Sequence, residues 1–379
     1  MLSMQDTVRN QVFQQAQTLI IKIGSNVLTR EDDLLDQDRI QALAEQIGRI
    51  LDSGRRVVIV SSGAVAAGIG VLGLDRKPAS LPELQASAAA GQMRLMKAWE
   101  FALGSRGRKI AQMLVTVNDF RHRRRYLNVR NTLRTLFHFD VVPVVNENDS
   151  VSIAEIALGD NDQLAAMIAS LVTDPLLVIL SAVDGLFDGA PGADESSLIS
   201  LVEQPCDSLA KYAVDEQSSA GRGGMQSKLQ AILNATSVGE SVILANGRHD
   251  GVLDRIANGV EVGTLFLANG SAIPAWKRWI GYTTQPEGRL NLDDGALRAV
   301  VENGRSLLAV GITEVDGEFD QGACVELVSL ERVIGRGLVN YSAADIRRIR
   351  GQKSAQIPEI LGRVPYEEVI HRDNLVIRD

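Results

Sequence analysis

A glycine-rich stretch at residues 221–228 contains the residue types that bind phosphate groups. It reads GRGGMQSK, and a helical pattern follows from Leu229 to Val238. Glycines let the backbone approach a ligand and turn its N–H groups inward, and a helix start adds partial positive charge. Lys228 supplies a full charge that can reach a transferring phosphoryl group. The Walker A spacing is absent, and such a turn is often only a connection, so other segments must support a phosphate site.

A second lysine lies inside an apolar segment. Residues 18–23 read TLIIKI, which predicts a buried strand, and Gly24 and Ser25 follow at once. Because an unpaired buried ammonium is very unfavourable, Lys22 either reaches solvent from the strand end or faces a ligand anion. At one site, Lys22 and Lys228 would repel each other unless an anion or a carboxylate lay between them.

The segment GDND at residues 159–162 offers such a carboxylate. It directly precedes a helical pattern over residues 161–171, so part of it is expected to form a turn and an N-cap. Asp160 or Asn161 can cap this helix while Asp162 points toward the lysines.

Two other polar clusters suit an amino-acid substrate. Asn146 to Asp149 follow a strand, where they either complete a turn or hold the substrate, with Asp149 attracting its ammonium group. Ser62 and the amides of Gly63 and Ala64 would hold a carboxylate or a developing negative charge.

The chemistry that these residues favour is charge neutralisation and positioning, because no Ser-His-Asp or Cys-His set occurs at matching positions. Phosphoryl transfer has this need. A carboxylate acceptor is already ionised at neutral pH and needs no general base. Mg²⁺ would bridge the nucleotide phosphates, which can supply most of its ligands, and no protein residue is predicted to bind a metal.

Alternating strands and helices position these clusters. The predicted strands are residues 18–23, 57–60, 111–117, 140–145, 176–180 and 241–245, and the predicted helices are residues 36–53, 82–103, 161–171 and 229–238. This order predicts an α/β fold with an open, mainly parallel sheet sandwiched by helices. Ligands bind beyond the C-terminal ends of such strands, where the polar clusters lie.

The sequence changes character after residue 268. Residues 269–288, which contain two tryptophans and a turn-rich run, are expected to form a linker. Residues 289–379 contain short apolar runs at 307–310, 324–328 and 333–338, separated by glycines and acidic residues. This pattern predicts a small β-rich C-terminal domain. A basic segment at 347–353 lies near its end.

Composition indicates a cytoplasmic enzyme with more than one domain. The chain has 379 residues, of which 45% are hydrophobic and 4% aromatic, and its net charge is −8. The length exceeds that of one typical domain, and the aliphatic composition suits a parallel sheet covered by helices. The negative charge argues against a nucleic-acid binder that uses its whole surface. The two distant cysteines, the polar N-terminus and the short apolar runs favour a reduced protein without a signal peptide or a membrane span.

These segments resemble those of the amino-acid kinase family, in its glutamate-phosphorylating branch. The segments that match in order and spacing are residues 21–25, 60–68, 143–149, 159–162 and 221–228. The pair NEND and GDND is the most specific. The C-terminal part resembles the PUA domain of many bacterial members. The resemblance implies a kinase domain over residues 15–270 and a PUA domain over residues 286–379.

The resemblance also implies a reaction: ATP and Mg²⁺ are used to phosphorylate the 5-carboxylate of L-glutamate, the first step of proline biosynthesis. Lys22 and Lys228 would stabilise the transferring phosphoryl group, and Asp162 would orient them. The implied glutamate-binding residues are Ser62, Asn146, Asp149 and Asn161. The implied ATP-binding residues are Lys22, Ser181, Ala182, Arg222, Gly223, Gly224, Met225, Gln226, Ser227 and Lys228.

Two segments depart from the pattern of the family. Ser181 and Ala182 stand where Thr-Asp is common, so one polar nucleotide contact is lost. Arg222 and Gln226 stand where threonines are common, and the charge of Arg222 could compensate near the phosphates. These changes affect nucleotide affinity more than the reaction. The basic run at 121–125 is expected to be a solvated or intersubunit face.

The family also implies partners, namely proline as a feedback inhibitor that overlaps the glutamate site and further copies of the chain in a dimer or tetramer. Because glutamyl phosphate is labile, coupling to the reductase that uses it is a further hypothesis.

Two alternative functions stay open. A kinase for another carboxylate, for carbamate or for a nucleotide is disfavoured by the clusters at 146–149 and 160–162. An RNA-binding protein acting through residues 286–379 is disfavoured by the acidic charge and by the lack of stacking aromatics beside the basic segment. Only weak, salt-dependent RNA binding is therefore expected.

Overall fold

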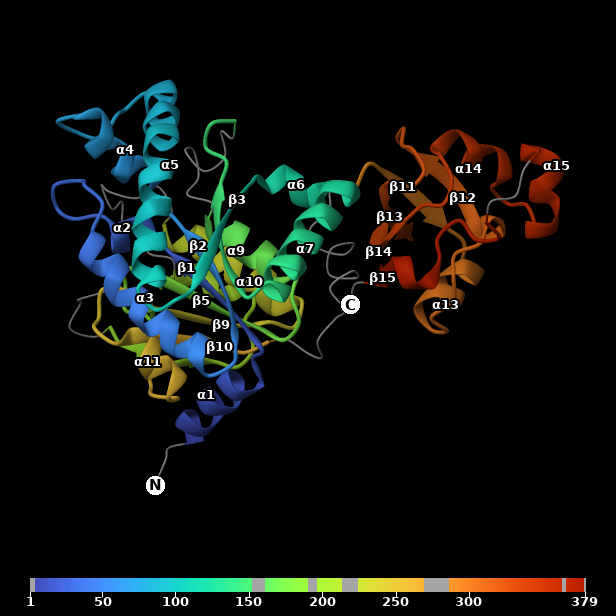
Figure 1. The fold of residues 1–379 in the computed structure, drawn as a ribbon. Helices are drawn as coiled ribbons and strands as arrows, with labels where there is room; N and C mark the ends of the chain where they lie inside the picture. Colours follow the sequence, from blue (N-terminus) through green and yellow to red (C-terminus); the bar gives the residue numbers. More distant parts are fainter. Residues whose placement is uncertain are drawn as a thin grey trace. The chain divides into compact units, whose positions relative to one another are not determined.

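The structure is a computed structural model of the chain, and it describes residues 4–151, 161–189, 196–212, 224–268, 286–362 and 366–377. The chain divides into two compact units (Figure 1). The first unit comprises Met1–Asp119 and Leu127–Ala272, and the second comprises Phe120–Tyr126 and Ile273–Asp379. All the predicted site residues belong to the first unit.

An eight-stranded sheet forms the centre of the first unit. Its strand order is β3-β4-β2-β1-β5-β9-β10-β8. The strands are β1 (Thr18–Ile23), β2 (Arg56–Ser61), β3 (Lys109–Val115), β4 (Val141–Glu147), β5 (Pro175–Ser181), β8 (Leu201–Val202), β9 (Ser241–Asn246) and β10 (Thr264–Phe266). Of these described neighbours, only β9 and β10 pair antiparallel. The prediction of an open, mainly parallel sheet is confirmed, and β8 and β10 are additions too short to stand out in the sequence.

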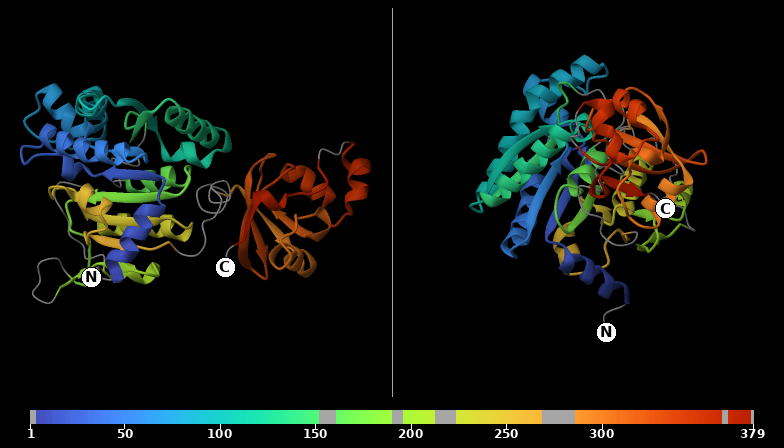
Figure 2. Two further views of the ribbon diagram at one scale, coloured as in Figure 1. Left: turned by 60° about the horizontal axis from the view of Figure 1, so that its bottom comes forward. Right: turned by 90° about the vertical axis from the view of Figure 1, so that its right-hand side faces the viewer.

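Helices pack on both faces of this sheet (Figures 1 and 2). The described helices between residues 4 and 268 are α1 (Met4–Gln15), α2 (Ser25–Leu28), α3 (Gln37–Asp52), α4 (Ala64–Leu72), α5 (Leu81–Gly104), α6 (Val117–Arg121), α7 (Arg123–His138), α9 (Asn161–Ala169), α10 (Met225–Ser237) and α11 (Val252–Ala257), with a 3-10 helix at Asp207–Tyr212 and a small hairpin of β6 (Leu186–Phe187) and β7 (Leu198–Ile199). Residues 120–126, from the end of α6 to the start of α7, are grouped with the second unit. The predicted helices are present as α3, α5, α9 and α10. None of the helices in the described ranges is long and apolar enough to cross a membrane.

Alternation along β1 explains why Lys22 lies at a site and not in the aliphatic core. Leu19, Ile21 and Ile23 point into a core that also contains residues of α3 and α5. Because successive strand residues point to opposite faces, Lys22 points to the other face of the sheet. There α9 packs across β1, β2, β4 and β5, and Lys22 contacts the first turn of α9.

Two glycines let α4 and α5 cross in backbone contact. A Cβ atom on Gly68 of α4 would lie 1.8 Å from the carbonyl oxygen of Ser87, and one on Gly91 of α5 would lie 2.0 Å from the carbonyl oxygen of Ala64. Both contacts are with backbone atoms, which cannot move aside as a flexible side chain would. A larger residue at either position would therefore push α5 away from α4 and from the turn between β2 and α4.

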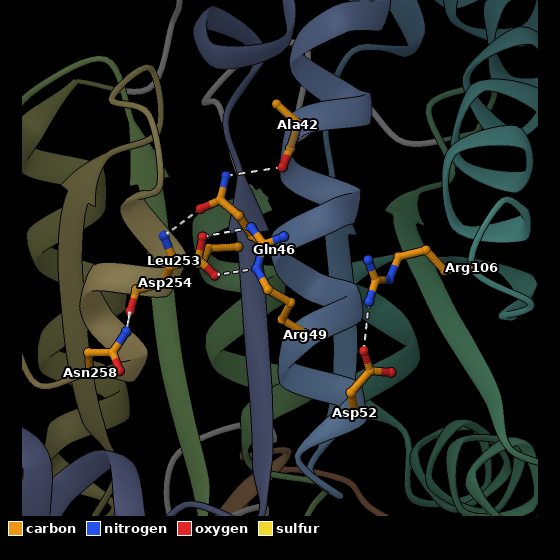
Figure 3. Close-up of polar contacts among 8 residues, drawn as sticks. All are labelled: Ala42, Gln46, Arg49, Asp52, Arg106, Leu253, Asp254 and Asn258. Atoms are coloured by element: carbon orange, nitrogen blue, oxygen red, sulfur yellow. Dashed lines mark hydrogen bonds and ion pairs between the residues drawn. The ribbon is translucent and has the colours of Figure 1, made fainter.

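Polar side chains join α3 to α11 (Figure 3). The buried Gln46 donates to the carbonyl oxygen of Ala42 at 3.1 Å and accepts from the N–H of Leu253 at 2.8 Å. Arg49 makes two hydrogen bonds to the Asp254 carboxylate, at 2.8 and 2.7 Å, and these bonds raise the pKa of the Arg49 guanidinium. None of the predicted site residues takes part in these contacts.

The second unit contains a five-stranded sheet of order β12-β11-β13-β14-β15, shown in orange and red in Figure 2. Its strands are β11 (Gly288–Leu292), β12 (Ile312–Asp316), β13 (Cys324–Ser329), β14 (Arg332–Leu338) and β15 (Leu375–Ile377), and its helices are α13 (Asp294–Val301), α14 (Ala343–Ile349) and α15 (Ile357–Leu361). The unit has its own aliphatic core, which includes Leu290, Val325 and Ile346. The prediction of a small β-rich domain is confirmed.

Within the second unit, the apolar run at residues 307–310 does not form a strand. Leu307 forms an isolated bridge with Ile370, and Ala309–Gly311 is a 3-10 helix that turns the chain into β12. Strands β11 and β12 were missed because polar residues interrupt their apolar runs, and β15 was missed because it has only 3 residues. Residues 269–285 of the predicted linker lie outside the described residues.

Candidate active site

Asp162 lies between two lysines from distant parts of the sequence. Lys22 is near the C-terminal end of β1, Asp162 is in the first turn of α9, and Lys228 is in the first turn of α10. Lys22 Nζ lies 2.7 Å from Asp162 Oδ1, and Lys228 Nζ lies 3.2 Å from Asp162 Oδ2. Lys22 is 4% exposed, Asp162 1% and Lys228 8%. The structure thus brings together the three residues that the sequence analysis assigns to phosphoryl transfer.

Burial and the ammonium groups act on Asp162 in opposite directions. Burial raises the pKa of the Asp162 carboxyl, but the charges and hydrogen bonds of Lys22 and Lys228 outweigh it, and the pKa lies below its ordinary value of 3.8. Asp162 is therefore ionised at neutral pH. The two ammonium groups in this nearly dry site favour an anionic ligand.

A second polar cluster joins the ends of β2 and β4 to the start of α9. Asn161 Nδ2 donates to Ser62 Oγ at 2.8 Å and to Asn146 Oδ1 at 3.0 Å, and the N–H of Glu147 donates to Asn146 Oδ1 at 2.9 Å. Asn146 and Asn161 are each 2% exposed. Oδ1 of Asn161 is buried and accepts no hydrogen bond from any residue that the structure describes. A buried acceptor without a donor is costly, and a bound ligand that donates to it would remove this cost.

The two clusters meet at α9, because Asn161 and Asp162 are consecutive residues at its N-terminus. One side chain contacts Ser62, and the next contacts the two lysines. A phosphoryl group held by the lysines would therefore lie close to an acceptor held beside Ser62. In-line phosphoryl transfer requires this proximity.

The turn after β2 presents backbone N–H groups at the start of α4. Gly63 has a φ of +106°, in the left-handed region that favours glycine, and it precedes the helix without a side-chain cap. The first N–H groups of α4, including that of Ala64, are therefore suited to an anionic ligand next to Ser62.

Asp149 lies two residues beyond the end of β4 and is half-buried. Its role in attracting a substrate ammonium group stays a prediction. Gly159 and Asp160, the first half of the GDND segment, lie outside the described residues.

The predicted phosphate-binding residues of the glycine-rich stretch lie around the start of α10. Gly224 precedes the helix, and Met225, Gln226, Ser227 and Lys228 form its first turn. Gln226 is exposed and Lys228 is buried, so the turn faces solvent on one side and Asp162 on the other. Arg222 and Gly223 lie outside the described residues.

The predicted nucleotide-binding residues after β5 lie beside a polar cluster that the sequence analysis missed. Ser181 ends β5, and Asn246 of β9 donates to the carbonyl oxygen of Ala182 at 3.3 Å and to Asp184 Oδ1 at 2.9 Å. His249 Nε2 lies 3.3 Å from the same Asp184 oxygen. The available signal was that Asn246 directly follows the predicted strand at 241–245, at the end of a parallel sheet where ligands bind.

Residues 17–246 match the amino acid kinase family, and residues 288–361 match the PUA domain. The chain belongs to the amino acid kinase family. Both clusters around Asn161 and Asp162 lie within the part that matches this family. The predicted resemblance to this phosphotransferase family, with a C-terminal PUA domain, is confirmed.

Several curated relatives are similar over nearly the whole chain. A protein of Thermoanaerobacter sp. (strain X514) named glutamate 5-kinase is 44% identical over 361 residues, which cover 95% of this chain and 97% of the relative. Proteins of the same name from Rhodopirellula baltica and Geobacter sulfurreducens are 45% and 44% identical, covering 98% of this chain and 96% and 100% of the relatives. The solved UMP kinase from Bacillus anthracis is 16% identical with a TM-score of 0.45, covering 67% of this chain and 97% of that chain.

Proposed function

We propose that this chain transfers the γ-phosphoryl group of ATP to the 5-carboxylate of L-glutamate. The product is glutamyl 5-phosphate, and the reaction is the first step of proline biosynthesis. The observation that carries the proposal is the junction at Asn161 and Asp162, which puts a cationic cluster directly beside a neutral amide and hydroxyl cluster. The relatives named glutamate 5-kinase, at 44–45% identity over nearly the whole chain, support glutamate as the acceptor.

In this proposal the lysines act on the phosphoryl group. Lys22 and Lys228 stabilise the charge that spreads over its outer oxygens during transfer. Asp162 holds both ammonium groups in place, at 2.7 and 3.2 Å, and offsets their mutual repulsion before the nucleotide binds. Because the cluster is nearly dry, these charges act with little screening by water.

The amide cluster positions the acceptor. The 5-carboxylate of glutamate is ionised at neutral pH and attacks without a general base. Ser62, Asn146 and Asn161 fix the glutamate molecule, and Asp149 attracts its ammonium group. The gain in rate on this side comes from proximity and orientation.

The nucleotide contacts the end of β5 at Ser181 and Ala182 and the start of α10. Within the described ranges, no group of three or more His, Cys, Asp or Glu side chains is arranged to hold a metal ion, and both lysines engage Asp162. We therefore assign the ligands of Mg²⁺ mainly to the phosphates of ATP, where the ion offsets part of their charge.

Further partners belong to the same proposal. Proline, which resembles a cyclised glutamate, inhibits at the glutamate site. The chain works as a dimer or tetramer in the cytoplasm, and a reductase takes up the labile product.

RNA binding by the PUA domain is proposed to be weak and salt-dependent. Three arginines of its basic segment already have partners within the second unit. Arg347 lies 2.7 Å from the Glu318 carboxylate. Arg350 donates to the carbonyl oxygen of Thr313 at 3.1 Å, and Arg348 donates to that of Ile360. These internal hydrogen bonds reduce what the segment can offer to phosphates.

ADP release from ATP and Mg²⁺ by the purified protein tests the proposed function. Glutamate, aspartate, N-acetylglutamate, carbamate and UMP are supplied as separate acceptors. We expect turnover with glutamate, suppressed by proline. Turnover with another acceptor and none with glutamate would contradict the assigned substrate. No turnover with any acceptor in a folded protein would contradict the proposed activity and direct attention to Ala182, Arg222 and Gln226.

A further inference from the structure

Helix α5 contributes a side chain to the amide cluster that the sequence analysis missed. Gln92 Oε1 accepts a hydrogen bond from Asn146 Nδ2 at 2.9 Å. The preceding residue, Gly91, makes the close backbone contact with α4 that brings α5 to this end of the sheet. Gln92 therefore enters the cluster from an element that carries none of the predicted site residues.

The hydrogen bond to Asn146 uses one of the two polar atoms of the Gln92 amide, its oxygen. Nε2 of Gln92 is buried and makes no hydrogen bond to any residue that the structure describes. Burying an amide with half of its hydrogen-bonding capacity unused destabilises a fold, whereas an apolar side chain of the same shape would not. The presence of glutamine at this position therefore calls for a role other than packing.

The hydrogen bonds in the cluster run outward from Asn161, to Ser62 on one side and through Asn146 to Gln92 on the other. Because Asn146 Nδ2 donates to Gln92, its Oδ1 faces the other way and accepts from Asn161 Nδ2. Asn161 Nδ2 also donates to Ser62 Oγ. Since Ser62 Oγ already accepts this hydrogen bond, its own hydrogen points elsewhere and can be donated to a ligand. The N–H of Glu147 also donates to Asn146 Oδ1, so Gln92 and the backbone of β4 together hold the Asn146 amide in this orientation.

We infer that Gln92 is a positioning residue that, together with the N–H of Glu147, holds the Asn146 amide in this orientation and so helps to present the Ser62 hydroxyl as a donor to the acceptor carboxylate. The identity of that carboxylate rests on the proposed function. Gln92 is not itself in contact with the reacting atoms. Without the Gln92 oxygen, Asn146 Nδ2 loses this acceptor, and the Asn146 amide is less firmly held against Asn161, which donates to Ser62.

A second contact from the same face of α5 holds the backbone of Ser62. Trp99, seven residues after Gln92, donates from Nε1 to Ser61 Oγ at 3.0 Å, and the Ser61 hydroxyl donates to the carbonyl oxygen of Ser62 at 2.9 Å. Two positions on one helix face thus hold the main chain and orient the side chain of the same serine.

The test uses Gln92→Met, which keeps the length of the side chain and removes the acceptor, with Gln46→Met as its matched control. Gln46 is also a buried glutamine that bridges two elements, but its contacts with Ala42 and Leu253 lie outside the amide cluster. We expect Gln92→Met to raise KM for glutamate by roughly tenfold or more, with kcat and KM for ATP changed by less than about twofold. Gln46→Met should lower the melting temperature and leave KM for glutamate unchanged.

A third variant, Gln92→Glu, keeps an acceptor oxygen at the same place. Its KM for glutamate should lie below that of Gln92→Met. The inference is overturned if a folded Gln92→Met binds glutamate as the wild type does, if Gln46→Met raises KM equally, or if Gln92→Glu is no better than Gln92→Met.

A readout that needs no substrate separates this inference from the proposed function. The side-chain amide NMR signals of Asn146 and Asn161 should shift in Gln92→Met and not in Gln46→Met. If the wild type fails to use glutamate but these signals shift as expected, the proposed substrate is wrong and the positioning role stands. If the signals do not move, the positioning role is wrong whatever the substrate.

Discussion

The two halves of the candidate site are held together by different forces. Around Asp162 the contacts join full charges, whereas around Asn161 they join neutral amides and a hydroxyl. A charged cluster responds mainly to its net charge. A neutral cluster responds to the direction of each donor and acceptor. Changes on the Asp162 side should therefore alter stability and rate, and changes on the Asn161 side should alter the affinity for the acceptor.

Asp162→Asn should have the largest effect. It leaves two buried ammonium groups without their carboxylate, which we expect to lower the unfolding free energy by about 3–5 kcal/mol and to abolish most activity. Urea unfolding of both proteins measures the loss of stability. A loss below about 1 kcal/mol would show that the lysines do not depend on this carboxylate.

The pH dependence of that loss tests the charge of Asp162. Because the pKa of Asp162 in the folded state lies below 3.8, its stabilising effect is complete above that value and is lost as the pH falls through the lower folded pKa. The difference in unfolding free energy between the wild type and Asp162→Asn should therefore be the same at pH 7 and pH 5. A difference that has already shrunk at pH 5 would show that burial outweighs the lysines.

Lys228→Ala should mainly slow the chemical step. We expect kcat to fall by roughly 10²–10³, with a smaller change in KM for glutamate, because the lysine acts on charge that develops during transfer. Lys22→Ala should behave alike. Lys211→Ala, which alters an exposed lysine of the same unit, is the control for steady-state kinetics. An unchanged kcat in folded Lys228→Ala would contradict the assigned role.

Ser62→Ala should separate the two halves most clearly. It removes the hydroxyl that accepts from Asn161 and leaves the Asp162 cluster intact. We expect KM for glutamate to rise by roughly tenfold, with little change in KM for ATP. Initial rates at varied glutamate and varied ATP measure both. An equal rise in the two KM values would mean that the halves are not distinct.

Gln46→Met should have the smallest effect on activity. The variant leaves the N–H of Leu253 without its acceptor and should cost about 1–3 kcal/mol of stability (Figure 3). Thermal unfolding measures this cost. Because no predicted site residue takes part in these contacts, kcat and both KM values should stay at wild-type levels, and a change in any of them would extend the site to α3.

The sequence predicts the site residues that stand out in a local pattern, but it does not predict contacts between residues that are far apart in the chain. Lys22 was predictable because a lysine inside an apolar strand needs a partner, and Asp162 was predictable because GDND opens a helix. The contact between Asn161 and Ser62 joins residues 99 positions apart and depends on how α9 packs across β2 and β4. No local pattern contains that information.

Gln92 and Asn246 were missed for a related reason. Gln92 lies in an alanine-rich helix and looks like any polar surface residue until its contact with Asn146 is seen. Asn246 follows a predicted strand, but its partners lie at the end of the neighbouring strand β5. The apolar run at residues 307–310 does not form a strand, because among its residues only Leu307 finds a pairing partner.

The most direct test of the central claim is to trap the product bond. The purified protein is incubated with glutamate, ATP and Mg²⁺ in the presence of hydroxylamine, which converts an acyl phosphate into a hydroxamate. We expect γ-glutamyl hydroxamate in an amount that matches the ADP released, and almost none with Asp162→Asn or Lys228→Ala. ADP release by the wild type with no glutamyl hydroxamate would contradict it, because the phosphoryl group would then be going to an acceptor other than the 5-carboxylate of glutamate.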